Sequence, residues 1–141
     1  MGDITLQPFK ELQGAIHTLL TGGGSPISIQ MYDEVEKSPT FPYGTYGEVE
    51  DSPMEARGVN GRNVLFPINI FSRDQSPGGK YEIYDIMDEI IAKMNAGKIS
   101  MTNFAEIQKT HTTPKVTRLE KEPGVSYRGT IVWLITVAKK T

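Results

Sequence analysis

Few residues in this sequence have the type and the spacing that enzyme chemistry requires. The chain has two histidines, His17 and His111, and neither has a carboxylate beside it at metal-ligand spacing. It has no cysteine, which excludes a disulfide framework, a thiolate metal site and a cysteine nucleophile. None of its serines lies in a nucleophile-elbow pattern. We therefore predict no catalytic residue, no bound metal and no cofactor, and we expect both histidines to be structural or exposed.

Three other motifs have a functional interpretation, and a structural one is favoured for each. Residues 22–25 (Gly-Gly-Gly-Ser) resemble a phosphate-binding loop, but they follow a predicted helix and no Gly-Lys-Ser/Thr comes after them. Residues 76–80 (Ser-Pro-Gly-Gly-Lys) precede a helix and could receive an anion, although a plain helix start is more common. Asp85, Asp88 and Glu89 could hold magnesium, but they fall on a helix face that we expect to be solvated.

These motifs lie in a chain with the composition of one globular domain. Of its 141 residues, 38% are hydrophobic and 23% are charged, which suits a packed core and not a disordered chain. The net charge of -2 opposes general nucleic-acid binding, because phosphate contacts need a positive field. No apolar run approaches the ~18 residues of a membrane span, and the first residues lack a secretion signal. We predict a single domain over residues 1–141, in a cytosolic setting and with no membrane partner.

The charge is divided unevenly along the chain. Residues 1–60 contain nine acidic and three basic residues, for a net charge of -6, whereas residues 61–141 have a net charge of +4. Seven of the nine acidic residues lie between Asp33 and Glu55. This stretch is either an ordinary solvated face or part of a molecule whose surfaces differ in sign and can stack on copies or neighbours.

Hydrophobic spacing predicts two helices and several strands. Apolar residues recur at intervals of three and four over residues 5–20 and 80–95, which is typical of amphipathic helices. Alternating patterns predict strands at residues 27–32, 43–50, 64–71 and 127–138, and residues 107–119 form a weaker strand-like segment. A flexible loop is expected at about residues 51–63.

The predicted fold class is α+β, with a mostly antiparallel four- to five-stranded sheet and two helices packed on one face. Pro67 lies inside a predicted strand and lacks an amide donor, which predicts an edge strand or a bulge. Residues 127–138 are apolar on both faces. Such a strand is either central in its sheet or meets another subunit with its second face.

Short motifs, taken in order along the chain, carry a resemblance to a known family. Tyr32-Asp33 ends the first predicted strand, and Phe-Pro-Tyr at residues 41–43 begins the second. The third strand ends in Phe-Ser-Arg at residues 71–73, and the second helix contains Tyr-Glu-Ile-Tyr-Asp-Ile-Met-Asp-Glu-Ile-Ile at residues 81–91. The last strand contains Arg-Gly-Thr-Ile-Val at residues 128–132. In the order and spacing of these motifs, the chain resembles the tail completion, or tail terminator, proteins of long-tailed bacteriophages and prophages.

The resemblance implies a structural role in virus assembly. Proteins of this kind form a ring, which we expect to be a hexamer of the chain with itself, that caps the tail tube and stops its polymerisation. The implied partners are the tail tube protein and the head connector protein, and DNA passes through the ring without specific binding. The implied location is the head-proximal end of the virion tail, after assembly in the host cytoplasm. The alternative is a small bacterial α+β binding or accessory module with no catalytic activity.

Residue-level hypotheses follow from this ring. The apolar strand and the expected loop are candidates for partner contacts, through Asp51, Glu55, Arg57, Asn60, Arg62, Val132 and Leu134. The acidic stretch is a candidate lining for the bore, through Glu48, Glu50 and Asp51, because like charge keeps DNA from adhering.

Overall fold

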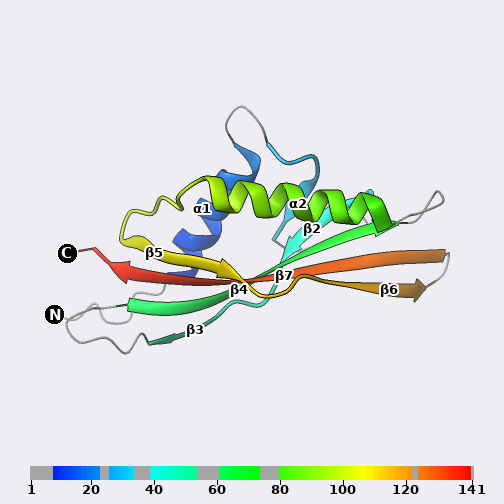
Figure 1. Ribbon diagram of the computed structural model, residues 1–141. Coiled ribbons are helices and arrows are strands. Elements are labelled where there is room, and N and C mark those ends of the chain that lie inside the picture. Colours follow the sequence, from blue (N-terminus) through cyan, green and yellow to red (C-terminus); the bar gives the residue numbers. More distant parts are fainter. Residues whose placement is uncertain are drawn as a thin grey trace.

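The computed structural model describes residues 8–22, 26–33, 39–53, 61–73, 80–121 and 124–140. These residues contain two helices, α1 (Phe9–Thr21) and α2 (Lys80–Ala96), and seven strands. The strands are β1 (Gln30–Tyr32), β2 (Tyr43–Tyr46), β3 (Glu50–Pro53), β4 (Gly61–Arg73), β5 (Phe104–His111), β6 (Lys115–Lys121) and β7 (Gly124–Lys139). Figure 1 shows their arrangement, with both helices drawn above the long strands and β3 below them.

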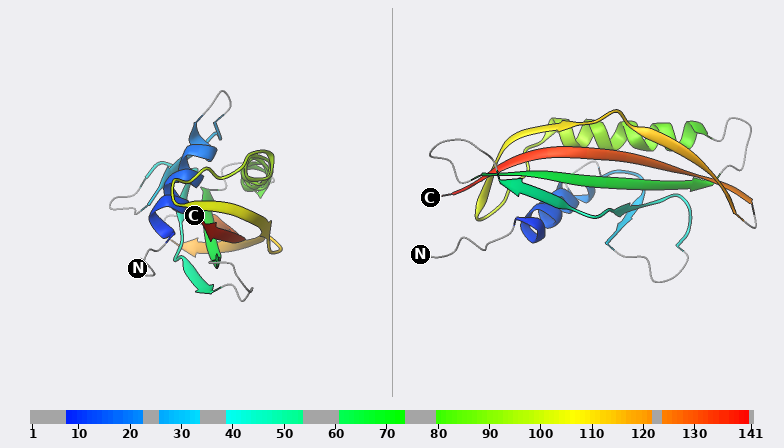
Figure 2. Two further views of the ribbon diagram at one scale, coloured as in Figure 1. Left: turned by 90° about the vertical axis from the view of Figure 1, so that its left-hand side faces the viewer. Right: turned by 90° about the horizontal axis from the view of Figure 1, so that it is seen from below.

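Two long antiparallel strands form the spine of the sheet. β4 pairs with β7 along its whole length, from Gly61 opposite Ala138 to Arg73 opposite Ser126. β2 and β3 follow one another along the free edge of β4, and β5 and β6 do the same along the free edge of β7. β1 adds to β2 in parallel, while the other pairs are antiparallel. The right-hand view of Figure 2 shows the two long strands running side by side through the molecule.

Pro67 occupies a place in β4 where its missing donor is tolerated. β2 pairs with β4 from Ile68 onward and β3 pairs with it as far as Leu65, so Pro67 falls between the two. Its carbonyl oxygen accepts a 2.9 Å hydrogen bond from the amide of Gly47. Because the N and O of a strand residue point to the same edge, the absent N–H faces this interruption and not β7. Of the two predicted alternatives, the edge strand is wrong, because β4 is central. A bulge-like irregularity is present in the neighbouring segment, where three residues, 47–49, lie opposite two, 66–67.

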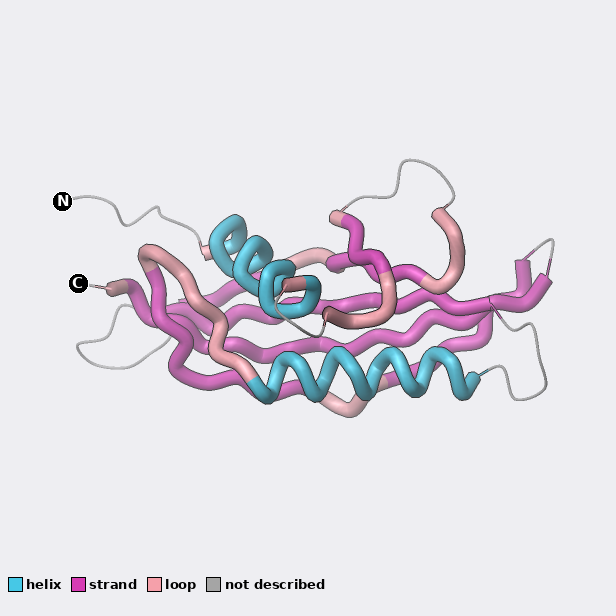
Figure 3. The backbone as a smooth tube through the Cα atoms, turned by 90° about the horizontal axis from the view of Figure 1, so that it is seen from above, coloured by secondary structure: helices cyan, strands magenta, loops and turns pink. Residues whose placement is uncertain are grey.

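The core lies between one face of the sheet and the two helices. Figure 3 shows both helices over the same side of the strands, and α2 contacts β4, β7 and α1. The alternation predicted for the two long strands is confirmed, because every second side chain is fully buried on the helix side. These side chains are Val64, Phe66, Ile68 and Ile70 of β4, and Ile131, Trp133, Ile135 and Val137 of β7. From the helices, Leu12, Ile16, Leu20, Ile83, Ile90 and Met94 complete the core.

The α+β class and the antiparallel sheet are confirmed, and the details differ in three places. The described part of the chain has seven strands and not four to five, because residues 43–50 and 107–119 each divide into two strands. The sheet is nevertheless five strands wide, since the divided pairs lie end to end. The flexible loop predicted at residues 51–63 is wrong at both ends, because residues 51–53 and 61–63 are strand; residues 54–60 lie outside the described residues.

Helix boundaries agree with the apolar spacing to within a few residues. α1 begins after Pro8, whose carbonyl accepts the amide of Leu12 at 2.8 Å, and the predicted residues 5–7 lie outside the described part. α2 extends one residue past the predicted end. Neither helix is long and apolar enough to cross a membrane.

Truncating the buried side of the spine should cost far more stability than truncating its other side. Phe66 faces Trp133 across β4 and β7 and is fully buried, whereas Leu134, one position further along β7, is 41% exposed. We expect Phe66→Ala to lower the free energy of unfolding by about 3–5 kcal/mol through the lost burial and the cavity. Leu134→Ala is the matched control and should cost about 1 kcal/mol or less. Urea denaturation followed by circular dichroism measures both, and equal losses would contradict the two-sided arrangement.

Candidate assembly surfaces

The face of the sheet that turns away from the helices carries an apolar patch at its centre. Leu65 of β4 lies opposite Leu134 of β7, and Pro67 lies opposite Val132. Leu65 and Leu134 are 38% and 41% exposed, and the other two are half-buried. We call these four residues the open-face patch. It contains both strand residues, Val132 and Leu134, that the sequence marked as interface candidates.

Polar cross-strand pairs border the open-face patch on both sides. Asn69 lies opposite Thr130 and Asn63 lies opposite Thr136. In each pair the threonine hydroxyl donates a 2.9 Å hydrogen bond to the asparagine Oδ1. Paired cross-strand side chains of this kind stabilise a sheet and hold its register. The patch is therefore an apolar centre with a fixed polar border.

An aromatic cluster lies beyond one of these borders and contains residues from three of the motifs that carry the family resemblance. Tyr43 pairs with Phe71 in register, and their rings stack with centroids 5.0 Å apart. Tyr32 and Phe41 pack against Tyr43, and the guanidinium of Arg73 lies 4.7 Å above the Phe41 ring. Burial raises the pKa of Tyr43. The motifs at residues 41–43 and 71–73, far apart in sequence, thus form one local structure.

The acidic candidates divide into exposed and paired groups. Glu48 and Glu50 are exposed. Asp51 is only partly exposed, and its Oδ2 lies 3.3 Å from Nε of Arg62, so this ion pair links β3 to β4. The remaining interface candidates, Glu55, Arg57 and Asn60, lie outside the described residues.

A groove that the sequence did not predict lies between α1, the end of α2 and the segment that connects α2 to β5. Its volume is about 930 Å³. We call it the α1 groove; its apolar lining includes Gly14, Ala15, Leu19 and Met101, and its basic lining consists of Lys10, Lys93 and Lys98. A side chain at Gly14 would meet no atom within 4 Å, so the groove is open above that residue.

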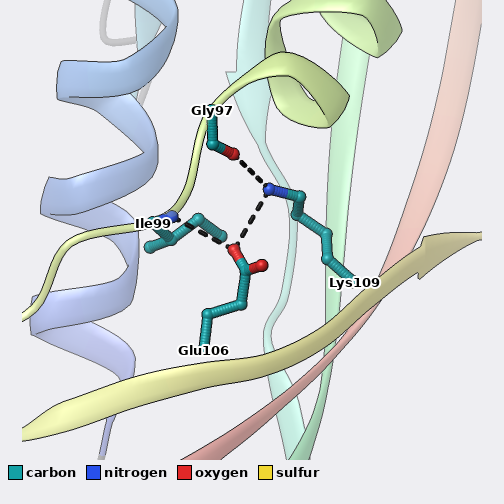
Figure 4. Close-up of polar contacts among 4 residues, drawn as sticks. All are labelled: Gly97, Ile99, Glu106 and Lys109. Atoms are coloured by element: carbon teal, nitrogen blue, oxygen red, sulfur yellow. Dashed lines mark hydrogen bonds and ion pairs between the residues drawn. The ribbon is translucent and has the colours of Figure 1, made fainter.

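Buried charges fix one wall of the α1 groove. Figure 4 shows that Glu106 and Lys109 of β5 hold the first residues after α2. Oε1 of Glu106 accepts hydrogen bonds from the amide of Ile99 and from Nζ of Lys109, both at 3.1 Å. Nζ of Lys109 also donates to the carbonyl of Gly97 at 2.6 Å, at the end of the helix where a cation is favoured. The Lys109 and Glu106 side chains are only 6% and 12% exposed, so each depends on the other.

The other end of the same connection is tied to α1 and to the end of β7. Glu11 accepts hydrogen bonds from the amide and the side-chain Nδ2 of Asn103, at 2.8 and 2.5 Å, and Lys140 donates to the carbonyl of Met101 at 2.8 Å. The amide of Asn103 lowers the pKa of Glu11 below its ordinary 4.5. Because the folded state holds the ionised form, this contact stabilises the protein at neutral pH and is lost as the pH falls through that lowered pKa.

The outer face of α2 carries two exposed tyrosines beside two carboxylates. Tyr81 and Tyr84 are 72% and 44% exposed, and Asp85 and Asp88 are exposed next to them. We call these four residues the α2 ridge. Glu89, which the sequence grouped with the two aspartates as a possible magnesium site, instead accepts hydrogen bonds from the amide and hydroxyl of Ser28 at 2.9 and 2.7 Å.

Both histidines contribute to packing. His17 of α1 forms a 2.8 Å hydrogen bond through Nδ1 with the hydroxyl of Tyr46. Burial and the nearby Asp33 raise the pKa of Tyr46, so its hydroxyl keeps the proton that it can donate. His111 of β5 donates from Nδ1 to the carbonyl of Thr112 at 2.7 Å, and its ring packs edge-on against Trp133.

Comparison with known proteins places this arrangement in a family. The model of the family described as Tail completion protein gp17 matches residues 11–133. The chain belongs to this family. It is accordingly a structural component of a phage-type tail, as its motif order predicted. No curated protein sequence matches the chain.

A solved structure has the same fold. A chain in the virion of a native gene transfer agent (GTA) particle superposes on this tail completion protein with a TM-score of 0.56. The match covers 92% of this chain and 90% of that chain at 14% sequence identity. The likeness shows a shared fold.

Removing the carboxylate beside Lys109 should destabilise this tail completion protein strongly. In Glu106→Ala the buried ammonium keeps only the Gly97 carbonyl, and we expect a loss of about 3 kcal/mol in the free energy of unfolding. The double variant Glu106→Leu/Lys109→Met removes both charges and should recover much of that loss. Denaturant titration of the single and double variants measures the coupling. Strictly additive losses would show that the two side chains do not depend on each other.

Proposed function

We propose that this protein forms a closed ring, a hexamer, on the head-proximal end of the tail tube, where it ends tube polymerisation and joins the tail to the head connector. The match of the tail completion family to residues 11–133 carries the proposal. The fold supports it, because in the described part of the chain both helices lie on one face of the sheet and the other face holds an apolar patch.

The open-face patch has the composition of a protein–protein contact. Its centre, with Leu134 and Val132, is apolar, and a hydrogen-bonded Asn–Thr pair lies at each end of it along the strands. Interfaces between proteins commonly have an apolar centre and a polar rim. In the proposed assembly, the patch is buried against a neighbouring protein of the tail.

The β3–β4 hairpin supplies the contacts to other tail components in this proposal. The ion pair between Asp51 and Arg62 joins its two strands at 3.3 Å, and the sequence between them contains Glu55, Arg57 and Asn60. These charged and polar residues are proposed to meet the tail tube protein or the head connector protein.

The exposed carboxylates before and at the start of β3 line the bore in this proposal. Glu48 and Glu50 form no ion pair within the described residues, whereas Asp51 is engaged by Arg62. Unpaired carboxylates repel the phosphates of DNA and so oppose adhesion as the DNA passes. The lining charge therefore comes mainly from Glu48 and Glu50.

Deleting the gene tests the assembly role directly. If the protein ends the tube and joins it to the head, lysates should contain unattached heads together with tails of abnormal length. A role in joining alone would leave the tails at normal length. Electron microscopy of the lysates distinguishes the two results, and complementation with the intact gene is the control. Normal infectious particles without the protein would contradict the proposal.

Reversing the lining charge should impair DNA passage without preventing assembly. For Glu48→Lys/Glu50→Lys we expect infectivity to fall about tenfold or more at an unchanged particle count, since added cations bind DNA phosphates by releasing counterions. The neutral variant Glu48→Gln/Glu50→Gln is the matched control and should have a smaller effect. Plaque counts compared with particle counts give the measurement. Full infectivity of the lysine variant would place these residues outside the bore.

A further inference from the structure

The α2 ridge is a protruding surface without a partner in the described part of the chain. Tyr81, Tyr84, Asp85 and Asp88 are spaced by three, four and seven residues, so they form one stripe on the helix. This stripe turns away from the buried face of Ile83, Ile86 and Ile90. Two tyrosines at 72% and 44% exposure are unusual for solvated helix surface and typical of contact surface.

The α1 groove is a concave surface whose charge and apolar lining complement those of the α2 ridge. Gly14 and Ala15 leave open space at the middle of its α1 side, and Met101 adds apolar surface from the opposite wall. Lys10, Lys93 and Lys98 line it without an ion pair among the described residues. The one acid in the lining, Glu11, is occupied by Asn103. The groove therefore presents three cations and an apolar floor, whereas the ridge presents two carboxylates and two aromatic rings.

The groove is held in shape before any partner arrives. Glu106 and Lys109 fix the start of the connection after α2, and Glu11 and Lys140 fix its end. A wall that is already positioned spares the ordering cost that a flexible loop would add on binding. Preorganisation of this kind favours binding, because the wall does not lose conformational freedom when a partner docks.

We infer that consecutive copies in the ring contact each other through the α2 ridge of one copy and the α1 groove of the next. The inference rests on the proposed ring. It specifies which surface of each copy meets the next copy. In Figure 1, the first turns of α2 lie at the far end of that helix from α1 and from the connection to β5. Two different surfaces that fit each other produce a head-to-tail contact, which closes into a ring when the rotation permits.

The absence of native cysteines makes this contact directly testable. Particles are assembled with the double variant Tyr84→Cys/Lys98→Cys and treated with a thiol-reactive cross-linker. We expect a ladder of products above the dimer, ending at the size of the ring. An equal mixture of the two single-cysteine variants should stop at dimers, since each copy then has one reactive site. Tyr84→Cys/Ser52→Cys, with the second cysteine on exposed β3, is the matched control and should give no ladder.

Charge exchange tests the same contact through function. Lys93→Glu/Lys98→Glu and Asp85→Lys/Asp88→Lys should each lower infectivity about tenfold or more, because like charges then face each other. The fourfold variant restores opposite charges and should recover most of the infectivity. The matched control combines Lys93→Glu/Lys98→Glu with four neutral-to-lysine changes on exposed residues away from α2, which return the same four units of charge and should not recover infectivity: Gln30→Lys, Thr40→Lys, Gln108→Lys and Thr110→Lys.

The results separate this inference from the proposed function. Purified particles that contain the protein but yield no ladder, or a ladder equal to that of the Ser52 control, would overturn the ridge-and-groove contact and leave the tail role intact. Absence of recovery in the fourfold variant would also overturn it. Absence of the protein from purified particles would instead remove the proposed function.

Discussion

The pairing of β4 with β7 is the constraint on which the remaining structure depends. Because side chains alternate across a strand, a register fixed from Gly61–Ala138 to Arg73–Ser126 sends Phe66 and Trp133 to one side, and Leu65 and Leu134 to the other. A slip by one residue would exchange the two sets. The two helices have a face to cover only because this register is held, and the open-face patch exists for the same reason. The buried core and the open-face patch thus both result from one strand register.

The α2 ridge and the α1 groove, the two surfaces of the inferred contact, depend on different levels of structure. The α2 ridge needs only the helix itself, since spacing alone aligns its four side chains. The α1 groove needs tertiary structure, because its lysines come from α1, α2 and the segment after α2. Polar contacts hold that segment. Among them, the pair of Glu106 and Lys109 is buried, so removal of either partner would leave an uncompensated charge. These buried charges position one wall of the groove.

The sequence predicted those features that repeat locally. Apolar spacing located both helices, and alternation located the buried sides of β4 and β7. Prediction from the sequence failed where the pairing between strands decides the structure. Pro67 indicated an edge strand by propensity, but a break in the neighbouring strand accommodates it in the centre. The α1 groove has no local signal, because Lys10 and Lys98 are brought together only by the fold. The Asn63–Thr136 and Asn69–Thr130 pairs likewise required the register.

The interruptions in the outer strands affect how the protein behaves when it is concentrated. A long, flat sheet margin with free amides and carbonyls recruits further strands and leads to aggregates. Here β1 has three residues, β3 has four, and β5 contains an irregularity between Glu106 and Gln108. Within the described residues, no edge of the sheet offers a long uninterrupted strand with which another polypeptide chain could pair. At high local concentration, copies of the protein are therefore expected to associate through their side chains and not to aggregate through backbone pairing between sheet edges.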